Sequence, residues 1–387
     1  MRKGIWVVIL AMGIIGWFSP GVFAQSVNTL VARQAQSINT QSLDHQVSQL
    51  VNPYPQIHVP TVSEIVSALL HHKNPFPLNA LFSAIGQAIG GDLAQEGRVL
   101  GVIFLLSVLA AILSRLSESI DASGNLAELA QMAVVSALIL IALHSFGVAL
   151  SMVHHLLGDL VHLMQSIIPL LVVLMAGSGE VASAGIFHPI MMLTVNMVAV
   201  LTRSWVLPLV LLATIIDLVG HWLPHFSLKN LALLLRQTGL TLLGGLMTLF
   251  LGVMAVEGSA GSVADGVSLR TGKFLANTFV PVVGKAFSDA MEAVLGSSLL
   301  LKNAVSVVGA LTIIVLVAFP LIKLFIMMVL YRLGAAATEP LGVAGVNKTL
   351  ETMASAVGWL LAVTGSVALM FFLMITVVLT ASNGAGL

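Results

Sequence analysis

The chain has 387 residues, of which 58% are hydrophobic and only 8% are charged, whereas about 25% of the residues in an ordinary globular domain are charged. This composition excludes a soluble globular enzyme and indicates a membrane protein. Lys plus Arg equals Asp plus Glu at 16 each, so we expect no nucleic-acid partner. The absence of cysteine excludes disulfides, thiolate catalysis and cysteine-ligated metals.

The N-terminus has the pattern of a secretory signal peptide. Arg2 and Lys3 precede an apolar run from Ile5 to Phe18, and a Ser-Pro-Gly break leads to a small-x-Ala cleavage site that ends at Ala24. We therefore predict that residues 1–24 are cleaved and that the chain from residue 25 starts outside the cytoplasm. An uncleaved anchor is the alternative, although the run is short for a span of about 20 residues.

Residues 25–97 are polar by the standards of this chain and contain several prolines. They predict a small extracytoplasmic segment of two or three amphipathic helices. This segment is too short to contain an enzyme domain.

Hydrophobic runs of bilayer length then recur, first within a group of helices over residues 98–256 and again over residues 304–387. They predict an all-α, polytopic integral membrane bundle of about eight spans, within a range of six to nine. The expected spans are 99–116, 131–150, 160–177, 186–204, 206–223, 238–256, 304–331 and 352–380.

Between the two groups of spans lies a charged segment, residues 257–303. Apolar positions fall at helical spacing opposite its charges, which predicts an amphipathic helix that lines a channel or binds a partner, or rests as a solvated face on the bundle. The candidate contact residues of this segment are Asp265, Arg270, Lys273, Lys285, Asp289 and Lys302.

Ionisable residues inside spans are costly in hydrocarbon and are candidates for function. Asp217 lies within an Ile-Ile-Asp-Leu stretch, and Lys323 follows Pro320 by three residues. Pro320 can kink its helix, so that Lys323 either points into a polar interior or extends to the membrane interface.

Histidines suggest a metal site. His155, Asp159 and His162 share one helical face with a spacing that zinc ligands can adopt. No HExxH or GxSxG motif accompanies them, so we assign no metal, no cofactor and no catalytic residue.

Several stretches resemble the stage III sporulation protein AE family of endospore-forming bacteria. They are Phe187-His188-Pro189, Leu234-Leu235-Arg236, the run from Gly252 to Asn303, Ala318 to Lys323, and Phe371 to Thr376. The resemblance covers nearly all of the chain after residue 80, whereas residues 25–80 match poorly.

The resemblance implies a multi-pass membrane subunit of a secretion-like complex that links the mother cell to the engulfed forespore. It implies a place in the mother-cell-derived outer forespore membrane. The implied partners are other products of the stage III sporulation A operon and, through them, a forespore protein. The family supplies no catalytic residues.

Within that complex the subunit is a pore, an export gate or an assembly platform. Two other functional classes stay open on the sequence alone. One is a self-sufficient secondary transporter with discontinuous helices near Gly244-Gly245 or Pro320. The other is an intramembrane metal-dependent hydrolase that uses His155, Asp159 and His162. The balance of positive charges is too even to fix the side on which residues 257–303 lie.

Overall fold

The computed structural model describes residues 40–52, 59–71, 125–220, 228–279, 283–342 and 344–381, together with scattered positions between 83 and 112. The described residues form helices and contain no strand. The predicted signal peptide, residues 1–24, lies outside the described residues.

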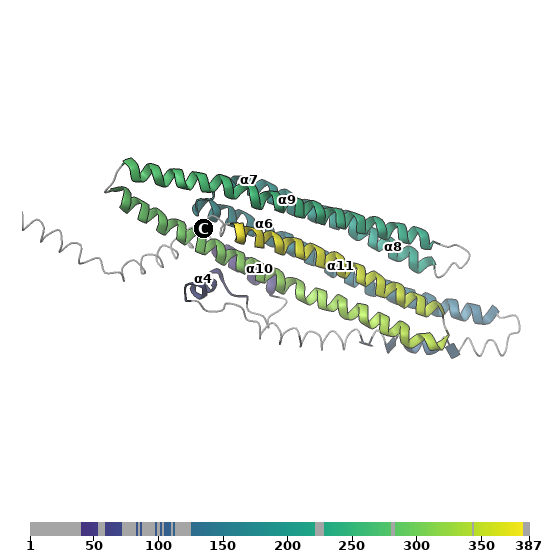
Figure 1. Ribbon diagram of the computed structural model, residues 1–387. Coiled ribbons are helices and arrows are strands. Elements are labelled where there is room, and N and C mark those ends of the chain that lie inside the picture. Colours follow the sequence, from purple (N-terminus) through teal and green to yellow (C-terminus); the bar gives the residue numbers. More distant parts are fainter. Residues whose placement is uncertain are drawn as a thin grey trace, which may run out of the picture.

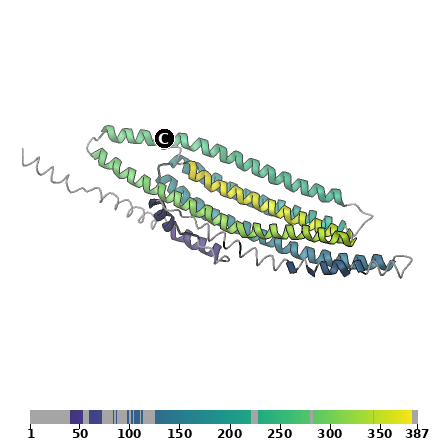
Figure 2. The same cartoon turned by 60° about the horizontal axis from the view of Figure 1, so that its bottom comes forward.

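Long antiparallel helices build the molecule (Figures 1 and 2). Helix α6 runs to a turn at residues 178–180, the next stretch returns as α7, η1 and α8, and α9, α10 and α11 follow in alternating directions. We call the end that carries the α6–α7 turn the proximal end, and the end that carries the α8–α9 and α10–α11 connections the distal end. The bounds are α6 Asn125–Gly177, α7 Val181–Leu201, η1 Thr202–Val206, α8 Leu207–Gly220, α9 Lys229–Phe279, α10 Val283–Thr338 and α11 Ala344–Ala381.

Five helical stretches in the described part of the chain are long and apolar enough to cross a membrane. The all-α membrane bundle expected from the sequence is therefore confirmed. The stretches are Met132–Gly177, Val181–Gly220, Lys229–Val256, Val294–Leu341 and Gly345–Leu379. At 1.5 Å per residue, the first is about 70 Å long, which is more than twice the roughly 30 Å hydrocarbon core of a bilayer.

The number of spans differs from the expectation because two expected pairs are each a single helical stretch. Spans 131–150 and 160–177 lie within α6, and spans 186–204 and 206–223 lie largely within the continuous run from α7 to α8. The polar residues that separate each pair lower the local hydropathy but retain helical backbone. Much of the remaining expected span, 99–116, falls outside the described residues.

The join between α7 and α8 is a π-turn, η1, with an identifiable cause. Pro208 has no N–H to donate to the carbonyl of Ser204, and its ring would clash with that carbonyl in a regular helix. The backbone widens instead, so that the N–H of Leu207 donates to the carbonyl of Thr202, five residues earlier. The helix continues through Arg203, which lies inside this wide turn.

The interior is filled by aliphatic side chains from α6, α7, α10 and α11, with Phe146, Phe250 and Phe371 fully buried. Gly309 of α10 lies at the tightest approach: a Cβ atom there would be 2.7 Å from Cδ1 of Ile167 and 3.0 Å from Cδ1 of Ile375. This contact fixes the relative axial positions of α6, α10 and α11.

Two short helices, α3 Thr40–Val51 and α4 Val62–Leu70, pack against α6 and α10. Helix α4 begins with a capping box in which Thr61 and Glu64 satisfy each other's backbone N–H groups. The N–H of Val62 also donates to Oδ1 of Asp44 at 3.0 Å. Burial raises the pKa of Asp44, and the bond from Val62 opposes that shift. Because both helices pack against the bundle, their apolar faces are part of the main core.

The Cys-free chain allows a direct test of the α8–α9 pairing. A Cβ atom on Gly239 would lie 3.7 Å from Cβ of Leu209, within the roughly 3.5–4.5 Å that a disulfide requires. The double variant Leu209→Cys/Gly239→Cys should therefore form a disulfide under mild oxidation, measured as the loss of two maleimide-reactive thiols.

The matched control is Leu209→Cys/Gly245→Cys, in which the second cysteine is about 9 Å further along α9. It should keep both thiols. Equal oxidation of the two pairs, or no disulfide in the first, would contradict this helix pairing.

Candidate functional site

The charged segment 257–303 forms most of a helical hairpin. Helices α9 and α10 extend beyond the proximal ends of α6, α7 and α11 and meet at residues 280–282 (Figures 1 and 2). Residues 283–302 alone span about 28 Å of helix. Of the candidate contact residues, Asp265, Arg270 and Lys273 belong to α9, and Lys285 and Asp289 to α10; their side chains lie outside the described part of the structure.

Lys302, the last of these candidates, lies at the base of the hairpin and is completely buried. Its Nζ donates to both carboxylate oxygens of Glu180, at 2.9 and 2.8 Å. The side chain of Glu180 is 12% exposed, whereas that of Lys302 is 0% exposed. This ion pair joins α10 to the turn between α6 and α7.

The turn is built to present Glu180 at this position. Helix α6 ends in a Schellman motif, in which the N–H of Glu180 donates to the carbonyl of Met175 and that of Gly179 to the carbonyl of Ala176. Gly179 has φ of 91°, which favours glycine. Glu180 then begins α7, where its negative charge is favoured by the helix dipole.

Close packing surrounds the pair. A Cβ atom on Gly177 would lie 2.8 Å from Oγ of Ser298, so a glycine is needed where α6 meets α10. Further along α10, Oδ1 of Asn303 and Oγ of Ser306 are buried without a hydrogen-bond partner. The base of the hairpin is therefore a dry, partly polar contact.

A second ion pair lies near the distal end and includes Asp217. Its Oδ2 accepts from Nη2 of Arg236 at 3.0 Å and from Oγ1 of Thr352 at 3.4 Å. Arg236 also donates to Oγ of Ser355 at 3.3 Å. The side chains of Arg236 and Asp217 are 13% and 20% exposed, so a partly buried network connects α8, α9 and α11.

Lys323, the other intramembrane candidate, lies half-buried on α10. Pro320 does not interrupt that helix, which continues to Thr338. The structure therefore places Lys323 inside a continuous helix, about 22 Å from its distal end.

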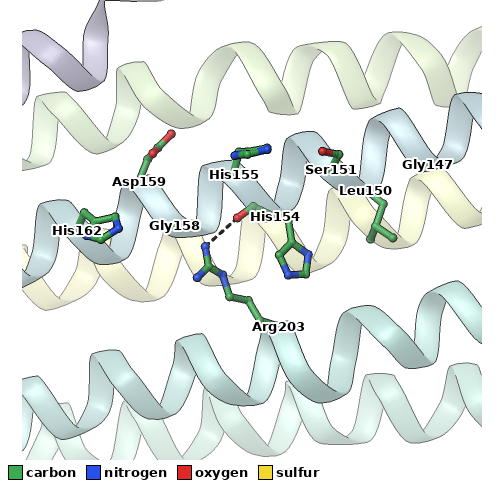
Figure 3. Close-up of a pocket in the computed structure, with 9 residues that line it drawn as sticks. All are labelled: Gly147, Leu150, Ser151, His154, His155, Gly158, Asp159, His162 and Arg203. Carbon is green, nitrogen blue, oxygen red and sulfur yellow. Dashed lines mark hydrogen bonds between the residues drawn. The ribbon is translucent and has the colours of Figure 1, made fainter.

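The histidine face of α6 lines a groove of about 610 Å³ (Figure 3). Arg203 reaches this groove from η1, and its Nη2 donates to the carbonyl of His154 at 2.9 Å. Within the described residues no three His, Asp or Glu side chains are grouped so as to hold a metal ion. His155, Asp159 and His162 line this groove together with an arginine, and their side chains are not gathered into one set of ligands. The lining residues are Gly147, Leu150, Ser151, His154, His155, Gly158, Asp159, His162 and Arg203.

Sequence reasoning did not single out Glu180, Arg236 or Arg203 as functional residues. Glu180 lay between two expected spans, Arg236 entered only through the Leu234-Leu235-Arg236 stretch that resembles the family, and Arg203 fell within the expected span 186–204. Each of the three side chains bonds a residue that is distant in sequence. No local sequence pattern predicts which two residues will pair. A charge beside a long apolar run indicates only that a partner is needed if the charge is buried.

Comparison with known proteins gives one family. Residues 61–382 match the model of stage III sporulation protein AE. The chain is 32% identical to the stage III sporulation protein AE of Bacillus subtilis (strain 168) over 398 aligned residues, which cover 99% of this chain and 98% of the relative. No solved structure matches the chain.

The buried ion pair gives a prediction about stability. Glu180→Gln leaves the buried Lys302 ammonium without its counter-charge and should cost about 3–5 kcal/mol. Lys302→Met should lower the free energy of unfolding by less, because the partly exposed Glu180 can turn toward water. The double variant Glu180→Gln/Lys302→Met should recover most of the loss, since no buried charge remains. Thermal unfolding of the purified protein in detergent measures all three.

A double variant that is as unstable as the sum of the two single variants would contradict this account. The account would also be contradicted if both single variants unfolded at the same temperature as the wild type. Arg332→Gln, at an exposed position near the distal end, serves as the control for the loss of a charge.

Proposed function

Because the chain belongs to the stage III sporulation protein AE family, we propose that it is a membrane subunit of the complex that links the mother cell to the forespore, and that it acts there as an assembly platform. The chain is a membrane protein of sporulation. In the proposal it lies in the mother-cell-derived outer forespore membrane. It binds other products of the stage III sporulation A operon and, through them, a forespore protein.

The projecting α9–α10 hairpin is the observation that carries the proposal. A pair of helices that extends beyond the rest of the bundle offers surface to a partner without disturbing the core (Figure 1). The sequence of the hairpin has charges of both signs, which suits selective protein contacts. The buried Lys302–Glu180 pair at its base holds the hairpin in one position relative to the bundle.

In the proposal the distal end faces the cytoplasm; the cations at its short connections support this, whereas those of the long hairpin segment count for less. Exposed Lys229, Arg332 and Lys348 all lie within a short distance of the distal connections. Such cations favour the cytoplasmic side. In that orientation the hairpin lies on the extracytoplasmic side, toward the intermembrane space where partner rings can meet it.

The proposed role requires no covalent chemistry. The family description names a stage of sporulation and no reaction. The two ion pairs of the described bundle join helices near its two ends, and a further group of polar residues lines the groove at Arg203. We therefore propose a structural role and no enzymatic one.

Charge reversal in the hairpin tests the platform. Lys273→Glu/Lys285→Glu reverses two charges of the hairpin, and unfavourable juxtaposition of charges with a partner costs several kcal/mol. We expect the yield of heat-resistant spores to fall at least about tenfold while the level of the protein is unchanged.

The matched control reverses two exposed acidic residues near the opposite end, Glu339→Lys/Glu351→Lys. Added positive charge there agrees with the proposed orientation, so sporulation should be normal. A normal spore yield from the hairpin variant would contradict the proposal that this segment binds partners.

Cysteine accessibility tests the orientation. Single cysteines replace Ser67 on the exposed face of α4, Ser288 in the hairpin and the exposed Asn230 at the start of α9. In intact sporulating cells, a membrane-impermeant maleimide that reaches the intermembrane space should label Ser67→Cys and Ser288→Cys, and should label Asn230→Cys only after permeabilisation. The reverse pattern would show that the hairpin faces the cytoplasm.

A further inference from the structure

Arg203 has hydrogen-bonding capacity that the described bundle does not use. A guanidinium carries five N–H donors in a planar fork. In this structure Nη2 donates to the carbonyl of His154, and Nε is buried without a partner. Nε is too deeply buried for a ligand to reach, but Arg203 lines an open groove, so the remaining donors of its guanidinium can bind an acceptor from outside the chain.

The position of the guanidinium is built into two helices. The π-turn η1 carries Arg203 on α7–α8, and Gly158 of α6 leaves room for it. A Cβ atom on Gly158 would lie 2.5 Å from Nη2. Any other residue at 158 would displace the guanidinium from the surface of α6 (Figure 3).

The surrounding groove is polar, open and of ligand size. His154 and His162 lie near Arg203 in the close-up, while Asp159, His155 and Ser151 point to the other side of α6 (Figure 3). Arginine beside imidazoles is suited to a phosphate group, which accepts bidentate bonds from a guanidinium.

The position of the groove along the axis of the bundle indicates the source of the phosphate. Gly309, Ile167 and Ile375 lie at one level. From that level, Gly158 lies about 14 Å, Lys323 about 21 Å and Trp359 about 24 Å toward the distal end at 1.5 Å per residue. Trp205, which is 59% exposed, lies in the same π-turn as Arg203.

Arginine, lysine and tryptophan within a zone of about 10 Å along the bundle are typical of the boundary between hydrocarbon and head groups. The level of Arg203 is also about 30 Å from the buried Lys302–Glu180 pair, which matches the thickness of a hydrocarbon core. The part of the bundle between the two levels is therefore long enough to hold one hydrocarbon core.

We infer that the groove at Arg203 binds the phosphate of a phospholipid head group, with His154 and His162 beside the phosphate. The site anchors α6 to the π-turn at the distal head-group level. It is independent of the proposed role of the hairpin.

Binding to the delipidated full-length protein tests the inference. Dihexanoyl-phosphatidylglycerol is added below its critical micelle concentration, and ³¹P NMR line broadening reports the bound fraction. Wild-type protein should bind the lipid, and Arg203→Gln should weaken binding at least about tenfold, as expected for the loss of a charge-assisted pair.

Two further variants guard against a folding defect. Arg203→Lys keeps the charge but loses the fork, so its affinity should be intermediate. Gly158→Val keeps Arg203 but blocks its place on α6, and should bind as weakly as Arg203→Gln. Arg332→Gln, exposed and distant from the groove, should bind like wild type.

Inorganic phosphate distinguishes the source of the group. The lipid should bind more tightly, because its glycerol and chains add contacts along the groove. Equal affinities would assign the site to a free phosphate and overturn the lipid. Unchanged lipid binding in Arg203→Gln, or no binding by wild type, would overturn the site itself.

Discussion

The hydrogen bonds of the backbone govern this architecture. In hydrocarbon no water is available to an N–H or C=O group, and each unsatisfied group costs several kcal/mol. A helix that enters the membrane therefore continues until its ends can be capped. Helix α6 passes through a stretch of histidines and an aspartate without a break, and ends at the Schellman motif of Gly179 and Glu180. At Pro208, where a bond must be lost, the helix widens into a π-turn and does not end.

This constraint also explains how much could be predicted from the sequence. Composition and long apolar runs were sufficient for the all-α membrane bundle and for the family. The span boundaries were less accurate, because hydropathy averages the side chains, whereas backbone continuity depends on capping and on proline. His155, Asp159 and Arg203 looked like the ends of spans and lie inside continuous helices. Partners such as Glu180 and Lys302, which are distant in sequence, could not be paired without the fold.

The length of the helices has a further consequence. A stretch of about 70 Å cannot lie upright within a hydrocarbon core of about 30 Å, so a large part of the bundle lies at or beyond the head groups. The polar residues are distributed accordingly. One ion pair lies at the proximal end, Arg203 and Lys323 lie near mid-length, and the Asp217–Arg236 network lies toward the distal end. Between these levels the packing is mainly aliphatic.

The two ion pairs differ in what they can contribute to the stability of the fold and to the positions of the helices. Asp217 and Arg236 keep some contact with solvent and share hydroxyl groups from α11, so their desolvation is incomplete. Lys302 is fully buried, and a pair of apolar side chains would hold α10 to the α6–α7 turn at a lower desolvation cost. Apolar contacts, however, tolerate sliding by a helical turn, whereas an ammonium between two carboxylate oxygens at 2.8 and 2.9 Å does not. The buried pair therefore serves the axial position of α10, and with it the distance that the α9–α10 hairpin extends beyond the bundle.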